Sequence, residues 1–412
     1  MLGIGSLLSF PADAVAAPRD EGSITLAAAI EAGSRLAPTV READQARAAA
    51  GSFARDPGST LPSLPQLTVL AGVRRPRGLP AGPELMATAQ QEIATRSLGA
   101  TRREAAEASV RTAEAELARA RLEGGANAAL AWIALREAHE LKTLRLAAAG
   151  DAERLLRVAS SRVSLGTATA TARSLAEAEV GAARLGLLEA EGWMTEARIA
   201  LAHAIGKPLD AALDAEGELE VSAAPPALPP HGPRPEDHPT LRAAEGRVAQ
   251  LVSEGRATHA SLGPTFSLGA SAWREGSGDH AIAAVVSVPL PFFDPARYDT
   301  GKHALAEAAA RAHASRIRFD LQRERTVAEH ERRHTREIET EVRTGLVAPL
   351  IAAQTTALVA YEAGTTELSV VLIARRTSLA AQERLVIALA DVRRAGVRAD
   401  ALEGTLLSKG LR

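Results

Sequence analysis

Apolar residues recur at heptad spacing in a first stretch that has no proline between Ser97 and Pro208. The seam comprises Ala134, Leu141, Ala148 and Leu155, spaced seven apart. This pattern is typical of long helices that pack as coiled coils. It predicts a helix over about 97–165, roughly 100 Å long, then a turn at Gly166 and a return helix over about 168–205. Gly124 and Gly125 predict a local kink in the first helix.

A second stretch has the same organisation. Ile317 and Ile338 lie 21 positions apart, as do Leu321 and Val342. These spacings predict a helix over about 301–363. A glycine again ends it, so the sequence predicts a turn at Gly364 and a return helix over about 367–397.

Two segments alternate apolar and small or polar residues instead, as half-buried strands do. In the first, Leu67, Val69, Ala71 and Val73 alternate, and Leu85, Ala87 and Ala89 do so again. In the second, Phe266, Leu268, Ala270 and Ala272 precede a turn, and Ile282, Ala284, Val286 and Val288 follow it. The pattern predicts β-hairpins at about 64–93 and 264–290, the second one more clearly.

The same order of elements occurs twice. Pro38–Arg41 (Pro-Thr-Val-Arg) matches Pro239–Arg242 (Pro-Thr-Leu-Arg), and all matched features lie about 200 residues apart, which indicates an internal duplication. The predicted organisation is a first repeat over 17–222, a proline-rich linker over 223–238, a second repeat over 239–400 and a C-terminal tail over 401–412. Each repeat would contain a short helix, a hairpin, a long helix and a return helix.

Composition narrows this picture. Hydrophobic residues make up 46% of the 412 residues, but aromatic residues only 3%. Alanine and leucine supply the apolar surface, which favours thin helical walls over a thick core. With 48 basic and 50 acidic residues the formal charge is −2, so no basic field recruits nucleic acid. The chain has no cysteine, which excludes disulfides and thiolate chemistry.

The chain has no uninterrupted run of about 18 apolar residues, so we expect no membrane-spanning helix. Any membrane-inserted part would then consist of β-strands, which need only about 9–11 residues each. The first residues are apolar and lead to Ala14-Val15-Ala16, an A-x-A pattern typical of a secretory cleavage site. We therefore interpret residues 1–16 as a signal-peptide remnant.

Three motifs resemble those of the TolC-type outer-membrane efflux proteins. Residues 288–294, Val-Pro-Leu-Pro-Phe-Phe-Asp, resemble the family's step from the last strand into a long helix. Residues 361–365, Tyr-Glu-Ala-Gly-Thr, resemble its Tyr-x-x-Gly-x turn, and residues 238–244, His-Pro-Thr-Leu-Arg-Ala-Ala, resemble the opening of its second half. The resemblance covers roughly residues 24–400, and the Pro-Leu-Pro-Phe-Phe form leans toward the heavy-metal-efflux branch.

The resemblance implies a mainly α-helical fold with a small β part. In it, a homotrimer joins four strands per chain into an intersubunit barrel in outer-membrane lipid, and long helices form a tunnel across the periplasm. It also implies a periplasmic adaptor and an inner-membrane pump, of RND type, as partners. Independently, four strands cannot close a barrel, which needs about eight, so strands of several chains must combine. The alternative is a structural coiled-coil protein of the periplasm or cytosol without a barrel.

By the same resemblance, the two glycine turns lie at the periplasmic tip that closes the tunnel. The residues expected there are Gly166, Thr167, Tyr361, Gly364, Thr365, Val370 and Ile373. Many members carry acidic residues where this chain has Val370 and Ile373, and a charged latch where it has Thr366 and Ala172. We hypothesise that this tip closes by apolar packing of Val370 and Ile373. Packing of both side chains between helices is the alternative.

The sequence also contains one short motif that is typical of an enzyme. Residues 330–334 spell His-Glu-Arg-Arg-His, the H-E-x-x-H pattern that places two imidazoles on one helical face beside a general base in zinc proteases. Arg332, Arg333 and Arg336 surround it, which opposes binding of a cation, and no third ligand stands out. No nucleotide-binding or serine-nucleophile motif occurs either. We therefore predict no enzyme activity, metal site or cofactor, and a solvated charged helix here.

Overall fold

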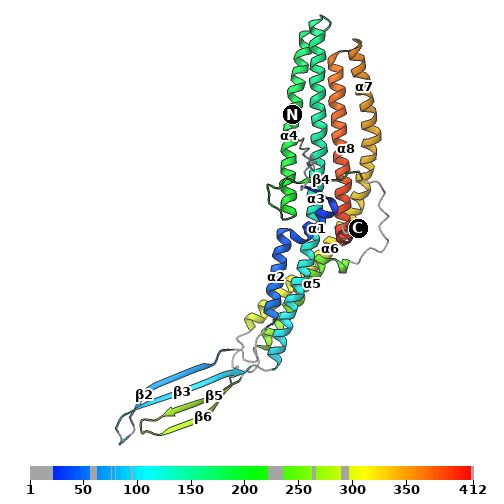
Figure 1. Ribbon diagram of the computed structural model, residues 1–412. Coiled ribbons are helices and arrows are strands. Elements are labelled where there is room, and N and C mark those ends of the chain that lie inside the picture. Colours follow the sequence, from blue (N-terminus) through cyan, green and yellow to red (C-terminus); the bar gives the residue numbers. More distant parts are fainter. Residues whose placement is uncertain are drawn as a thin grey trace, which may run out of the picture.

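A computed structural model describes residues 22–55, 63–75, 77–78, 80–93, 96–220, 235–261, 266–288 and 297–409. The chain is elongated, with a β-sheet at one end and a layer of long helices at the other (Figure 1). The predicted signal remnant, most of the predicted linker and the motif residues Pro289–Asp294 lie outside the described residues.

The helices carry the length of the molecule. They are α1 (Leu26–Leu36), α2 (Pro38–Arg55), α3 (Arg96–Ser164), α4 (Ala170–Ala204), α5 (Pro239–Ala260), α6 (Arg297–Glu341), α7 (Ala348–Glu362), α8 (Leu368–Leu402) and the short α9 (Leu406–Lys409). A 3₁₀ turn at Pro235–Asp237 precedes α5, and a π-helical segment at Val342–Val347 joins α6 to α7. Helix α3 alone has 69 residues. The first short helix expected from the sequence is thus two helices, which meet at Ala37 and Pro38.

Both hairpins contribute to one four-stranded sheet. Its strands are β2 (Gln66–Arg74), β3 (Gly82–Ile93), β5 (Phe266–Arg274) and β6 (His280–Ser287), in the order β2-β3-β5-β6. Every neighbouring pair is antiparallel, and β3 pairs with β5 across the two halves of the chain. In that central pair the hydroxyls of Thr88 and Ser271 hydrogen-bond at 2.8 Å. Strands β2 and β6 are therefore the open edges of the sheet.

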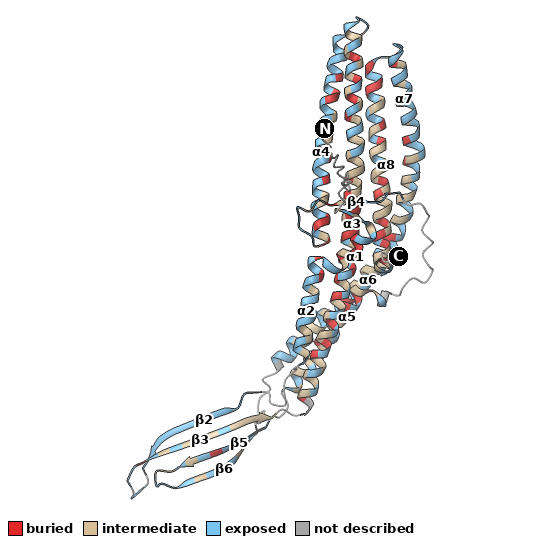
Figure 2. Cartoon of the chain, viewed as in Figure 1, coloured by how far each residue is buried: buried red, intermediate tan, exposed pale blue. Residues whose placement is uncertain are grey.

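The main core lies where the two halves meet, next to a small parallel ribbon of β1 (Ser23–Thr25) and β4 (Asp214–Glu216). Trp132 of α3 is 1% exposed there, and its indole N–H donates to the carbonyl of Ile24 at 2.7 Å. Leu406 of the predicted C-terminal tail is also buried in this cluster, so the end of the chain belongs to the packed structure. Away from this core, most helical surface is intermediate or exposed (Figure 2).

The glycine pair in α3 has a different role from the one expected. Helix α3 runs through Gly124 and Gly125 without a break. A β-carbon on Gly124 would lie 2.6 Å from the carbonyl oxygen of Gly33, and one on Gly33 would lie 2.4 Å from the Cβ of Ala128. The absence of side chains therefore lets α1 approach α3 closely, and helical hydrogen bonding continues through the position where a kink was expected.

The second long helix is interrupted where the sequence predicted continuity. Its hydrogen bonding widens to π-helical form over Val342–Val347, just before Pro349. Proline lacks the N–H that would bond to the carbonyl four residues earlier, here that of Gly345, and its ring crowds that carbonyl, so local widening relieves the conflict. The stretch Tyr298–Glu362 also contains one window apolar enough to cross a membrane by length and composition, which a search for uninterrupted runs missed.

Candidate functional site

The two helical hairpins end in turns of the same backbone form, at the end of the layer far from the sheet (Figure 1). Gly166 has φ +73° and Gly364 has φ +81°, a left-handed conformation that glycine adopts without strain. The hydroxyl of Thr167 donates to the carbonyl of Arg162 at 3.1 Å, and that of Thr365 donates to the carbonyl of Ala360 at 3.0 Å. Each threonine thus satisfies a carbonyl that its helix end leaves open.

Tyr361 anchors the second turn to the first hairpin. Its side chain is 3% exposed. The cluster around it comprises Leu155, Ala159, Ala176, Leu368, Val371 and Leu372, which come from α3, α4 and α8. Its hydroxyl has no hydrogen-bond partner among the described residues. The tyrosine is therefore held mainly through its ring.

Arg162, near the end of α3, makes two contacts with this tyrosine and so clasps it. Its guanidinium donates from Nη1 to the carbonyl oxygen of Tyr361 at 2.6 Å and lies 4.7 Å from the centre of the ring. A cation above an aromatic face is attracted by the negative face of the ring. One side chain thus joins the two hairpins by a hydrogen bond and a cation–π contact.

Val370 and Ile373 lie on a different face of α8 from its packed residues. Val370 is 47% exposed and Ile373 is 64% exposed, whereas Val371 is fully buried. Neither side chain is enclosed by helices of its own chain, so closure by apolar packing and packing between helices of neighbouring copies both stay predictions. The two side chains form an exposed apolar patch about one helical turn long on α8.

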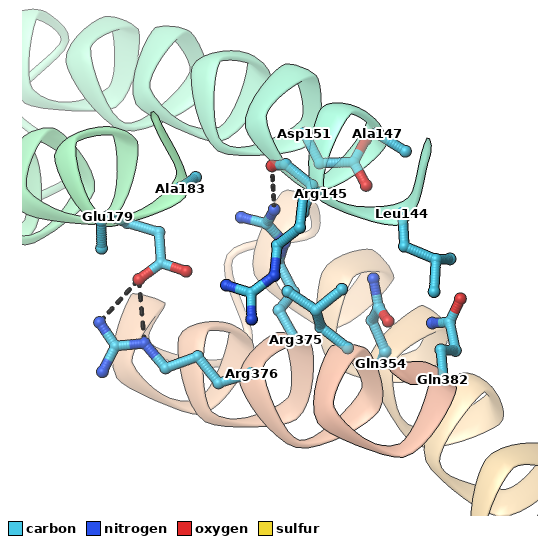
Figure 3. A pocket seen from close by; sticks show the side chains of 13 residues that line it. Leu144, Arg145, Ala147, Asp151, Glu179, Ala183, Gln354, Arg375, Arg376 and Gln382 are labelled. Atoms are coloured by element: carbon cyan, nitrogen blue, oxygen red, sulfur yellow. Dashed lines mark hydrogen bonds and ion pairs between the residues drawn. The ribbon is translucent and has the colours of Figure 1, made fainter. Parts of the chain in front are cut away.

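Below the tip, arginines of α8 hold the hairpins together. Arg376 donates from Nε and Nη2 to Oε2 of Glu179 on α4, at 3.0 and 2.7 Å (Figure 3). The neighbouring Arg375 donates to the carbonyl of Ala148 on α3 at 3.0 Å, and Arg145 of α3 donates to Glu383 at 3.1 Å. The three arginines and Glu179 line a cleft of about 200 Å³ between the hairpins.

Burial governs the electrostatics of this cleft. Desolvation lowers the pKa of Arg375, while Asp151 and Glu179 partly counteract the shift. The guanidinium stays charged at neutral pH because arginine starts from a very high pKa. It therefore serves as a permanent hydrogen-bond donor that ties α8 to α3.

All seven residues expected at the tip from the sequence lie at or next to the two turns. The sequence did not point to Arg162, nor to the pairing of Arg376 with Glu179. The partners in these contacts stand 199 and 197 positions apart. An arginine on a helix gives no local signal of such a partner, so only the packed structure identifies them.

The H-E-x-x-H motif lies elsewhere, on α6. The rings of His330 and His334 are stacked, with centroids 5.5 Å apart and planes 13° from parallel. Among the described residues, no group of three or more His, Asp or Glu side chains is arranged to hold a metal ion. The ligand set of a zinc protease is therefore not assembled in this part of the chain.

Comparisons with known proteins identify the architecture. No family model matches the sequence, and no curated protein matches it either. Solved structures do match: the outer-membrane channel OprN has a TM-score of 0.76 at 19% identity, covering 92% of this chain and 90% of its own. The chain has the fold of the TolC-type outer-membrane efflux channels.

Two further channels share this TolC-type fold over nearly their whole length. The CmeC outer membrane channel of Campylobacter jejuni matches with a TM-score of 0.77 and 15% identity, covering 94% of this chain and 88% of its own. CusC matches with a TM-score of 0.69 and 14% identity, covering 92% and 91%. These matches do not distinguish the heavy-metal-efflux branch from the other branches, so the assignment of this chain to that branch stays a prediction.

Proposed function

We propose that the chain is the outer-membrane channel of a tripartite efflux system, a passive duct that extends from the outer membrane into the periplasm. The observation that carries this proposal is the open sheet. Strands β2 and β6 each have one unpaired edge, and both carry exposed apolar side chains, such as Leu67 at 70% and Ile282 at 82%. Unpaired, apolar edges are a hazard in solution and are satisfied by closure with further strands.

Closure needs further copies of the chain. Because all four strands alternate in direction, β6 of one copy would run antiparallel to β2 of the next. Four strands are too few for a closed barrel, which takes about eight or more. Three copies would give the twelve-stranded barrel that the resemblance implies, and that number rests on the resemblance.

The helical layer, like the sheet, has two edges with exposed apolar side chains. Helices α4 and α7 form its two outer edges (Figure 1). Leu185 and Leu188 of α4 are 59% and 65% exposed, and Val359 of α7 is 60% exposed. The two edges differ from one another, so contact between copies would be head-to-tail, which closes into a ring when the rotation fits. A ring of thin, alanine-rich helices would enclose a tunnel.

This arrangement also explains the repeated order of elements, which we attribute to an internal duplication. No energy-transducing site is needed in a passive duct, so an inner-membrane pump of RND type and a periplasmic adaptor would drive export of small molecules or metal ions. The competing hypothesis, a coiled-coil protein without a barrel, gives no reason for a sheet with two open apolar edges.

We further propose that the tip is the gate. Val370 and Ile373 of each copy would meet at the axis of the ring and close it by apolar contact, while Arg162 holds Tyr361 in place within each chain. Introducing charge at the constriction would attract water and cations. Val370→Asp should therefore raise single-channel conductance and cation selectivity in planar bilayers, and Val371→Asp, at a buried position, serves as the contrast. Unchanged conductance in Val370→Asp would place that residue outside the pore.

The duct itself is tested by membrane fractionation and gel mobility. The full chain should be recovered with outer membranes and migrate as an oligomer that heat converts to a monomer. Replacing Ile282 by Asp on edge strand β6 should abolish the oligomer, because a charge facing lipid opposes insertion. Asp at the exposed Leu146 of α3 is the matched control. Recovery of the unaltered chain wholly in the soluble fraction would contradict the proposal.

A further inference from the structure

The stacked histidines of α6 are the one motif that the channel function leaves unused. His330 and His334 lie one helical turn apart, so both imidazoles project from the same face. Both residues are exposed, and Ala328, two positions before His330, is buried. Residues two apart point to opposite sides of a helix. The pair therefore faces away from the packed side of α6.

Two of the three arginines next to the motif lie on the opposite side of the helix from the histidines. Arg332 and Arg336 each follow one of the histidines by two positions, which places them on the opposite side of the helix. Only Arg333 remains beside the pair, so the repulsion expected from the sequence is much reduced.

A carboxylate lies on the histidine face instead. Glu337 is three positions beyond His334, and its Oε2 lies 3.8 Å from Nδ1 of His334. A carboxylate beside one ring nitrogen orients the imidazole and leaves Nε2 to bind a metal, which is the usual outer partner of a metal-binding histidine. No hydrogen bond occupies the His330 ring among the described residues.

We propose that His330 and His334 form a two-imidazole site for a late first-row divalent ion, such as Ni²⁺, Cu²⁺ or Zn²⁺. Imidazole nitrogens favour these ions, whereas Mg²⁺ and Ca²⁺ prefer oxygen ligands. Modest rotation of two exposed side chains brings their Nε2 atoms to one ion, water completes the coordination, and Glu337 supports His334. The site needs only a folded α6 and stands independently of the channel function.

The test is calorimetric titration of the detergent-solubilised full chain with Ni²⁺. His330→Ala and His334→Ala should each weaken binding by about tenfold or more, and Glu337→Gln by less. His313→Ala, an exposed histidine on the same helix without a histidine one turn away, should leave the affinity unchanged. Excess Mg²⁺ should not compete.

A register variant makes the test specific. Exchanging two neighbours, His334→Thr with Thr335→His, keeps the composition but moves the second imidazole off the shared face. Loss of Ni²⁺ binding in this exchange supports the site. Equal binding by the exchange variant, or full competition by Mg²⁺, would overturn it. Circular dichroism of each variant confirms that the helices are intact.

Discussion

The two hairpin tips have the same backbone but different anchors. Both turn at a left-handed glycine followed by a threonine that bonds back to its helix. Only the second tip buries a tyrosine, and only the first supplies the arginine that clasps it. The form of each turn thus depends on a few neighbouring residues, whereas the attachment between the tips depends on how the two hairpins pack together. Evolution can alter the attachment and leave the turn unchanged.

The arms behind the tips differ as well. Helix α3 is continuous over 69 residues and uses its glycines for close contact. The corresponding arm of the second half is divided by the π-helical segment before Pro349. One arm is therefore a continuous α-helix, and the other contains a π-helical joint.

Gly124→Ala should have the largest effect, because the new methyl group would collide with the backbone of α1. Overpacking of this kind costs about 1–3 kcal/mol. Gly150→Ala on the same helix meets nothing within 4 Å, and should instead stabilise by about 0.5–1 kcal/mol. Thermal unfolding at a matched scan rate distinguishes them. Equal shifts in both variants would show that α1 does not approach α3 as described.

Arg162→Ala should loosen the second tip, because it removes both the hydrogen bond and the cation–π contact. We expect a loss of about 1–2 kcal/mol in local stability. Hydrogen exchange should rise at the Gly364 turn, with the Gly166 turn of the same molecule as the internal reference. Tyr361→Phe should have little effect, since the hydroxyl has no partner in the part of the chain that the structure describes. A large effect of Tyr361→Phe would reveal a partner from another chain.

The N-termini of the return helices give a smaller contrast. The hydroxyl of Thr169 accepts a hydrogen bond from the N–H of Ala172, whereas Glu367 at the matching place makes no side-chain cap. Thr169→Ala should destabilise α4 by about 1 kcal/mol, and Glu367→Thr should stabilise α8 by a few tenths to about 1 kcal/mol. Hydrogen exchange in the first turn of each helix measures both. Hydrogen exchange should rise in Thr169→Ala and fall in Glu367→Thr, and changes of the same sign would contradict the prediction.

The smallest effect concerns pH. His238 caps α5: its Nδ1 accepts from the N–H of Thr240, and Nε2 lies 3.3 Å from the carbonyl of Ala401. Burial lowers the pKa of His238, partly offset by that carbonyl and by Glu324 and Glu123. A lowered folded-state pKa means that stability is full above the usual histidine pKa and falls as pH drops through it.

This loss comes from a single titrating group and should therefore be small. Urea unfolding at about pH 7.5 and pH 5.5 should show it in the unaltered chain. His238→Asn, which caps without titrating, should show less of it. Ala37 stands at the equivalent position of the first half, so that half should lack the effect. Equal acid sensitivity of His238→Asn and the unaltered chain would assign the loss to other groups.

Local features of this fold were predictable from the sequence, and contacts between distant residues were not. The turns at Gly166 and Gly364 and the alternation in β5 and β6 depend on neighbouring residues, and the sequence pointed to each. Pro349 was a visible local signal for the interrupted helix, but the heptad spacing before it outweighed that signal.

The ribbon of β1 and β4, the clasp by Arg162 and the contact of Gly33 with Gly124 depend on pairs far apart in the chain. A single sequence does not encode such pairs in any local pattern, because what matters is which surfaces meet. The exposure of Val370 and Ile373 likewise depends on which helices pack against α8. The sequence identified both residues as candidates, but only the packed α8 assigns their face.

The pairing of β3 with β5 has a consequence for biogenesis. Its partners, from Leu85 with Arg274 to Ile93 with Phe266, belong to opposite halves of the chain. During synthesis the α3–α4 hairpin can close as soon as it emerges, whereas β3 has no partner from the second half until β5 (Phe266–Arg274) has been made. Pairings between distant residues also form slowly. The nascent chain therefore carries an unpaired apolar hairpin until β5 is made, and in that interval the hairpin is exposed to aggregation.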